Sequence, residues 1–202
     1  MADASKQLFE SLRSYRSIET LIENGEAESL YLECKSPGGP KIGYELTKTV
    51  ARCVSAFSNA EGGVILWGVS TTHHKHDERD ILTQIEPIGK IKTLESRVAE
   101  LLPRTTRPSI LNYESKIIQR KKTDTRGLLV SYIPKTTADP LQASDEIFYF
   151  RSGSSNVPTP FEMIRRMFAT AAVPDLHADL GARQAKRLDN GNWTIPLIII
   201  NR

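Results

Sequence analysis

Hydrophobic and polar positions change period several times along the 202-residue chain, and each change marks an expected element. Between residues 29 and 35 apolar and polar side chains alternate, which is typical of a strand with one buried face. Residues 42–59 carry apolar side chains at helical spacing. The next segment, GGVILWGV at residues 62–69, is almost wholly apolar and predicts a central strand covered on both faces. The main domain is therefore expected to begin as strand, helix, strand.

The rest of the chain continues this alternation. Short helices are expected over residues 6–24, before the first strand, and a polar loop with three histidines follows the apolar strand. The pattern predicts an α/β fold with the order strand-helix-strand-helix-strand-strand in a mixed sheet, with an additional strand and a C-terminal helix. The later elements are expected as a helix at 93–102, a hairpin of strands 109–119 and 127–134, a strand at 146–151 and a helix from residue 160.

Two domains are expected. Residues 1–172 form the main domain, of which residues 1–25 are a helical lead-in. Residues 173–202 have the pattern of a linker followed by the beginning of a second, β-rich domain, because the apolar run ending at Arg202 needs sheet partners that the chain does not offer after it. We therefore expect a further domain beyond Arg202.

The composition fits an ordinary soluble globular protein, with 39% hydrophobic and 25% charged residues. Cys34 and Cys53 match no metal or redox spacing, which favours reduced thiols in the cytoplasm. No apolar run has the length of a signal core or a membrane span, so we expect a cytoplasmic protein without a membrane partner. The net charge of +3 is a weak argument for a polyanionic ligand.

The distribution of charge is more informative than its sum. Five cations gather on or beside the predicted hairpin, whose tip reads QRKKTDTRG. Such an arm suits the phosphate backbone of a nucleic acid, although a charged loop that is merely solvated has the same composition. The five residues are Lys116, Arg120, Lys121, Lys122 and Arg126.

The stretch AESLYLECKS raises a second question about charge. Glu33 and Lys35 share one face of the first strand, with Glu28 five residues upstream of Glu33. They form either a surface ion pair of little energetic value or a site for a hard divalent metal. Five is an odd step, so Glu28 and Glu33 can share a site only if Glu28 lies before the strand.

Three segments in this order, ESLYLECKS, VSAFSNAEGGVILWGV and IFYFRSGSSNVPTPFEM, resemble the Schlafen AlbA-type domain, over roughly residues 28–168. The resemblance implies an Alba-like fold and nucleic-acid binding, with RNA favoured over DNA. In some members it implies a divalent-metal-dependent endonuclease acting on tRNA-like RNA or single strands, at times in antiphage defence. The alternative is a non-catalytic regulatory or sensor module of a longer protein. A homodimer is a further expectation.

The resemblance also assigns site residues. Glu28 and Glu33 correspond to the carboxylates that hold Mg²⁺ or Mn²⁺, and Lys35 to the lysine that assists catalysis. Nucleolytic members carry a third acid just after the Gly-Val strand, where this chain has Ser70 to Thr72. Thr71 would be a weaker, neutral ligand, and Asp77 could reach the site only if its loop folds over it.

The third segment contributes a turn that suits a phosphate. There Arg151 and Ser154 match an Arg-x-Gly-Ser pattern, although the arginine could equally brace the turn. The segment SPGGPK lacks the Gly-x4-Gly-Lys-Ser/Thr pattern of a P-loop, so no ATP site is predicted.

Overall fold

The structure, a computed structural model, describes residues 3–37, 44–74 and 79–171, and after these 176–180, 186–187, 189, 193–194 and 197–201. A mixed sheet lies at its centre, with one parallel pair and otherwise antiparallel neighbours. Its order is β1-β2-β8, and both β7 and the short β5 also pair with β8. The strands are β1 (Leu32–Lys35), β2 (Gly63–Trp67), β5 (Ile88–Gly89), β7 (Glu114–Ile118) and β8 (Arg126–Ile133).

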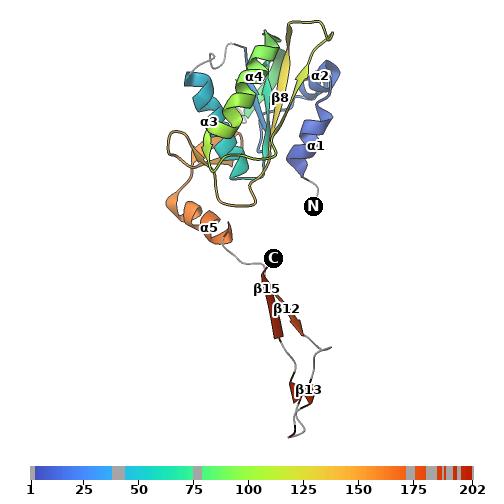
Figure 1. Cartoon of the computed structure of the whole chain (residues 1–202). Helices are drawn as coiled ribbons and strands as arrows, with labels where there is room; N and C mark the ends of the chain where they lie inside the picture. Colours follow the sequence, from blue (N-terminus) through green and yellow to red (C-terminus); the bar gives the residue numbers. More distant parts are fainter. Residues whose placement is uncertain are drawn as a thin grey trace.

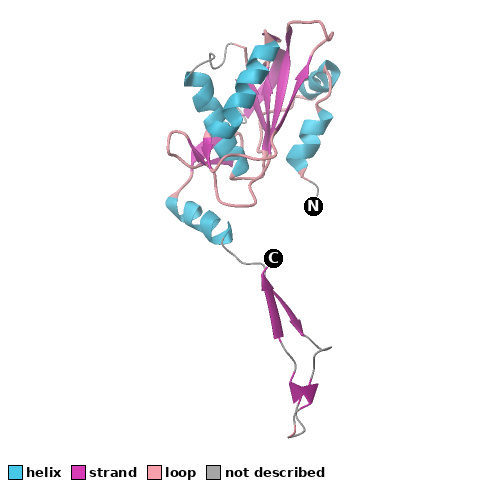
Figure 2. Cartoon of the chain, viewed as in Figure 1, coloured by secondary structure: helices cyan, strands magenta, loops and turns pink. Residues whose placement is uncertain are grey.

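Helices cover both faces of this sheet (Figure 1 and Figure 2). α3 (Tyr44–Ser58) and α4 (Ile91–Leu101) pack on one face, and α1 (Ala4–Ser11) and α2 (Tyr15–Glu23) on the other. The main order β1-α3-β2-α4-β7-β8 is the predicted one, so the α/β fold class with its mixed sheet is confirmed. The two-faced burial predicted for β2 follows from its central position in the sheet, whereas β1, predicted to have one buried face, is buried on both faces from Leu32 to Cys34.

An apolar core lies on each side of the sheet. On the α3 side, Phe57, Ile65 and Leu129 are fully buried. On the α1 side, Ile18, Leu66 and Val130 are fully buried. Successive residues of β2 and β8 point into opposite cores, which is why both strands carry runs of apolar residues, Val64–Trp67 and Leu128–Val130.

The segment after β2 differs from the predicted polar loop. It is a β-hairpin of β3 (Val69–His74) and β4 (Arg79–Ile85), with His73 and His74 inside the first strand. Val69 and Leu82 anchor it in the core on the α1 side. The pattern missed these strands because exposed hairpin strands with many polar residues lack the apolar alternation of a half-buried one. His76 lies outside the described residues.

Smaller elements complete the described chain. The turn expected after residue 151 joins two paired strands, and a helix follows it. The described parts of residues 173–202 form two further antiparallel pairs. Among the described helices, none has the length and apolar character needed to cross a membrane. The smaller elements outside the central sheet and its helices are η1 (Leu102–Arg104), β6 (Thr106–Arg107), β9 (Gln142–Ala143), β10 (Tyr149–Ser152), β11 (Ser155–Pro158), α5 (Phe161–Ala171), β12 (Leu176–Leu180), β13 (Lys186–Arg187), β14 (Trp193–Thr194) and β15 (Leu197–Asn201).

A buried amide at the end of α3 holds the later part of the chain in place. Asn59 donates to the carbonyls of Leu141 and Tyr149, at 2.9 and 3.0 Å, and accepts the Leu141 N–H at 2.7 Å. Ser55 supports it by accepting the Tyr149 N–H at 2.9 Å. These bonds satisfy backbone groups of a loop that would otherwise be buried without partners.

The two glycines that follow α3 are each required, for different physical reasons. Gly62 has a φ of 73°, the left-handed conformation that favours glycine and is common just after a helix. A Cβ on Gly63 would lie 2.1 Å from the Phe57 ring, so only glycine lets β2 pass beneath α3. The pair therefore fixes both the end of the helix and the close approach of the next strand.

Replacing Asn59 by alanine is expected to lower the free energy of unfolding by roughly 2–4 kcal/mol, because the Leu141 N–H and the Tyr149 carbonyl lose their described partner. Urea denaturation followed by circular dichroism measures this. Glu61→Gln, on the exposed neighbour that pairs with Lys135, should change it by less than about 0.5 kcal/mol. Equal stability of the two variants would contradict the role given to Asn59.

Candidate functional site

Glu33 lies in the middle of β1, and its side chain points toward α3. In the parallel register with β2 it stands opposite Ile65, a residue of the core on the α3 side. Only 5% of Glu33 is exposed. Of the two alternatives for Glu33 and Lys35, the exposed surface pair is ruled out, because α3 and the β10–β11 hairpin cover this face of β1 and bury the Glu33 carboxylate.

The partner that makes this burial possible is Arg151, which is 0% exposed on β10. Its Nη1 donates to Oε2 of Glu33, and also to Oδ1 of Asn156 at 3.0 Å. A buried carboxylate is tolerated when a cation and further hydrogen bonds compensate for lost hydration. Arg151 is thus placed as the counter-ion of Glu33.

The remaining donors of Arg151 bind backbone carbonyls before and within β1. Nε and Nη2 donate to the Ser29 carbonyl at 3.1 and 2.8 Å, and Nη2 donates to the Leu32 carbonyl at 2.9 Å. The guanidinium also lies over the Phe57 ring, 4.9 Å from its centroid. This geometry corresponds to the bracing alternative for Arg151, since its donors are engaged inside the protein. Ser154 lies in the turn between β10 and β11.

Lys35 holds the other oxygen of Glu33. Its Nζ donates to Oε1, and its side chain is 24% exposed. Burial lowers the pKa of the Lys35 ammonium, but the charge interactions with Cys53 and Glu33 and the hydrogen bond to Glu33 outweigh it, so the pKa lies above its usual value. Lys35 therefore stays charged, and both carboxylate oxygens of Glu33 are bound to cations.

Glu28 lies before β1, as a shared site with Glu33 requires. Its backbone N–H donates to the Asp80 carbonyl on β4 at 2.9 Å. Its side chain turns back toward the strand, and Oε1 accepts the Cys34 N–H at 2.7 Å. Burial, and next the negative charge of Glu33, raise the pKa of Glu28 to about 7. The two carboxylates are thus close enough to influence each other.

The third-ligand candidates do not complete a metal site. Ser70 donates to Glu86 at 2.7 Å, and Thr71 stands opposite Leu82 in the β3–β4 hairpin. Asp80 pairs with His73 at 3.3 Å. Asp77 lies outside the described residues. Among the residues that the structure does describe, no three His, Cys, Asp or Glu side chains are grouped to hold a metal ion.

The donor set around Glu33 does not fit Mg²⁺ or Mn²⁺. These ions need free oxygen ligands, whereas Oε1 and Oε2 of Glu33 are bound to Lys35 and Arg151. A divalent ion would have to displace a buried guanidinium that also holds three backbone contacts. Oε1 of Glu28 already accepts the Cys34 N–H, and the raised pKa of Glu28 leaves its carboxyl group partly protonated at neutral pH.

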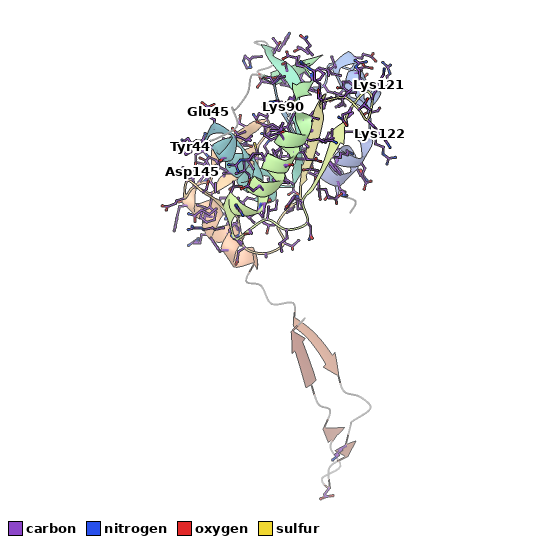
Figure 3. The ribbon with its side chains drawn as sticks, turned by 45° about the horizontal axis from the view of Figure 1, so that its top comes forward. Tyr44, Glu45, Lys90, Lys121, Lys122 and Asp145 are labelled. Atoms are coloured by element: carbon purple, nitrogen blue, oxygen red, sulfur yellow. The ribbon has the colours of Figure 1, made fainter. Side chains whose placement is uncertain are left out.

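The predicted nucleic-acid residues fall into two separate regions. Arg151 is buried on the α3 side, whereas the hairpin cations extend past the N-terminal helices. Figure 3 shows Lys121 and Lys122 at the end of this hairpin, and Tyr44 and Asp145 on another side of the molecule. The basic tip, as we call it, is the exposed part of the set: Arg120, Lys121, Lys122 and Arg126.

Lys116 belongs to the hairpin but not to its tip. Its Nζ donates to the Phe9 carbonyl and lies over the Phe9 ring, 4.0 Å from the centroid. Burial and the nearby charges of Arg13 and Lys6 lower the pKa of Lys116. It fastens α1 to β7 and offers less to a phosphate than the tip does.

Several residues at these sites escaped the sequence analysis. Asn156 and the Ser29 carbonyl complete the Arg151 site, and Arg13 and Arg16 lie beside the basic tip. The cations had a visible signal, since they flank Tyr15 at the start of α2. Asn156 had none, because only the pairing of β10 with β11 brings it opposite Arg151.

The fold and its motifs define an α/β domain whose polar motif residues hold a sheet between two helical layers. The Schlafen AlbA_2 family model matches residues 28–160, about two thirds of the chain. The chain therefore belongs to the Schlafen AlbA_2 family, which makes it a nucleic-acid-related domain. The family assignment made from the three segments is confirmed.

Searches of known proteins add two distant structural likenesses. The DIP2311 protein from Corynebacterium diphtheriae is 14% identical with a TM-score of 0.45, and the match covers 91% of this chain and 31% of that one. The N-terminal domain of a RecG-related protein from Nitrosomonas europaea is 19% identical with a TM-score of 0.44, over 62% of this chain and 75% of that one. This chain thus spans about a third of the length of the first. No curated protein matched.

Replacing Arg151 by methionine is expected to lower the free energy of unfolding by about 3–5 kcal/mol, because it leaves a buried carboxylate with one cation fewer. Chemical denaturation measures the loss. The double variant Glu33→Gln with Arg151→Met should be less destabilised than the sum of the single variants. Arg97→Met, which breaks the exposed pair with Glu100, serves as control and should cost at most about 1 kcal/mol. Strict additivity would show that the buried pair is not coupled.

Glu28 makes stability depend on pH with a defined sign. Its pKa is 4.5 in the unfolded chain and about 7 in the folded one, so the folded chain binds more protons between these values. The free energy of unfolding should therefore fall as pH rises through this window. Glu28→Gln should remove that decline and be more stable at pH 8, by on the order of 1–2 kcal/mol after allowing for solvent screening. Parallel pH profiles from pH 5 to 8 would contradict the assignment.

Proposed function

We propose that this chain is a nucleic-acid-binding domain that grips the phosphate backbone with the basic tip. The observation that carries the proposal is the exposure of all four tip cations on one arm of a chain that belongs to the Schlafen AlbA_2 family. Exposed lysines and arginines on a protruding arm suit phosphates, which they contact without reading the base sequence.

The contacts inside the tip leave its charges available. Asp124 accepts the backbone N–H of Lys121 at 3.0 Å, which shapes the turn without using the lysine side chain. One nitrogen of Arg126 donates to the Pro87 carbonyl at 2.8 Å, and its charge is retained. A charge that is held by a neutral carbonyl stays free to interact with a phosphate.

This proposal favours a binding module, with regulation or sensing as its use within a longer protein. Support comes from the site around Glu33, where the motif carboxylate forms a buried ion pair with Arg151. In this arrangement the first motif stabilises the domain, and the surface function is left to the hairpin.

Metal-dependent cleavage is the second candidate, acting on tRNA-like RNA or single strands and serving antiphage defence. The observation that favours it is that the Glu28 side chain turns back onto β1, where its Oε1 accepts the N–H of Cys34, the residue next to Glu33. It requires Lys35 to release Oε1 of Glu33 when a metal and a substrate bind. RNA preference and a homodimer belong to this proposal as well.

Fluorescence anisotropy with labelled tRNA, single-stranded RNA and duplex DNA tests binding. The expected result is affinity that falls steeply with salt, with a slope of roughly 0.7–0.9 per phosphate contact. Lys121→Gln with Lys122→Gln should weaken binding and reduce that slope by about 1 to 2. Arg104→Gln, at an exposed cation in η1 just after α4, should leave both unchanged.

The same substrates incubated with Mn²⁺ or with EDTA separate the two candidates. Cleavage that needs Mn²⁺ and is lost in Glu28→Gln would favour the enzyme. Binding without cleavage would favour the module. Absence of binding to every nucleic acid would refute the proposed function.

A further inference from the structure

A groove runs between the start of α2 and the hairpin of β7 and β8. Its cavity volume is about 480 Å³. That size lies in the range of sites that hold one small molecule or one unit of a polymer. Four of its lining residues are cationic and two supply an aromatic and an aliphatic surface: Arg13, Tyr15, Arg16, Ile117, Arg120 and Lys122.

The cations of this groove come from two separate parts of the chain. Arg13, in the connection between α1 and α2, and Arg16, in the first turn of α2, are exposed and precede the residues matched by the family model. Arg120 and Lys122 belong to the basic tip. Two other hollows, of about 400 and 280 Å³, lie beside residues 134–141 and have Lys135 as their one cationic lining residue, which pairs with Glu61. Neither of these two hollows shares the charge of the groove.

The groove also presents a flat, stacked surface. The guanidinium of Arg120 lies over the Tyr15 ring, 4.7 Å from its centroid, while the Arg120 side chain is 67% exposed. Tyr15 is held in place because it packs against the core on the α1 side. A guanidinium that is supported on one side by a ring leaves its other side open to a nucleobase.

Two carboxylates mark the edge of the groove. Glu19 lies 3.8 Å from Arg16 and 3.9 Å from Arg120, and Glu23 binds Arg16 at 2.7 and 3.0 Å. These ion pairs orient the guanidinium groups in the free protein. They are exposed, so a phosphate can replace them at small cost.

We infer that this groove binds single-stranded nucleic acid, with Arg13 and Arg16 on the phosphates and a base stacked on Arg120. The inference rests on the proposed function and adds the class of ligand and the contribution of the N-terminal helices. A single strand fits because its bases are free to stack, whereas a duplex hides them and would use only the cations. The stacked surface would then serve no purpose for a duplex.

The test compares short labelled oligouridine, oligodeoxythymidine and a blunt duplex in anisotropy titrations of the full chain at two salt concentrations. Arg13→Gln with Arg16→Gln should weaken single-strand binding about tenfold and lower the salt slope by about 1.4, for two lost phosphate contacts. Tyr15→Leu keeps an apolar side chain but removes the ring, and should cost about five- to tenfold. Thermal unfolding checks that it is folded.

Glu19→Gln gives a result of opposite sign. Removing the carboxylate that competes for Arg16 and Arg120 should strengthen single-strand binding several-fold, which loss of folding cannot mimic. Arg104→Gln on the opposite side of the sheet is the matched control and should have no effect. A preference between the RNA and the DNA strand would support the inference and identify the sugar.

The outcomes are distinct. Binding that is unaffected by the Arg13, Arg16, Tyr15 and Glu19 variants would overturn this inference and leave the proposed function standing. Equal affinity for strand and duplex, with no effect of Tyr15→Leu, would overturn the choice of a single strand. Absence of binding to all three probes would overturn both proposals.

Discussion

The buried ion pair between Glu33 and Arg151 is the constraint on which the rest of the domain depends. Glu33 is 5% exposed and Arg151 is 0% exposed, so neither charge can be hydrated without opening the core. Burying either one alone would be costly, which forces β10 to lie against β1 whenever the sheet is covered by α3. The same guanidinium donates hydrogen bonds to the Ser29 and Leu32 carbonyls and so fixes the path of the chain into β1.

This constraint also separates structural from functional roles within the family motifs. The carboxylate of Glu33, the guanidinium of Arg151 and the amide of Asn59 each satisfy buried partners far away in the sequence. They bind the second half of the chain to the first through polar contacts in a low-dielectric interior. The cations of the hairpin and of the segment around Tyr15, by contrast, are exposed and line one groove on the α1 side of the sheet.

The burial of the motif charges favours a binding module over a metal-dependent enzyme. A metal site needs carboxylates that are open and negatively charged, whereas Glu33 is neutralised by two cations and Glu28 has a pKa near neutrality. A binding surface needs only exposed cations in a fixed arrangement. The pairing of β7 with β8 provides that arrangement, and the stacking of Arg120 on Tyr15 connects it to α2.

The sequence alone determined the order of the main elements, the α/β class, the family and the basic hairpin, because these depend on local periodicity and on charges adjacent in the chain. It also set the condition that Glu28 must lie before the strand if it is to share a site with Glu33, and the structure places Glu28 there. Only the tertiary structure decided that the second face of β1 is covered, since Arg151 is 118 residues from Glu33. For the same reason, only the tertiary structure shows that Lys116 binds Phe9 and that Arg13 and Arg16 lie beside the hairpin. Contacts between distant segments have no local pattern, and they determine which charges are buried and which can meet a ligand.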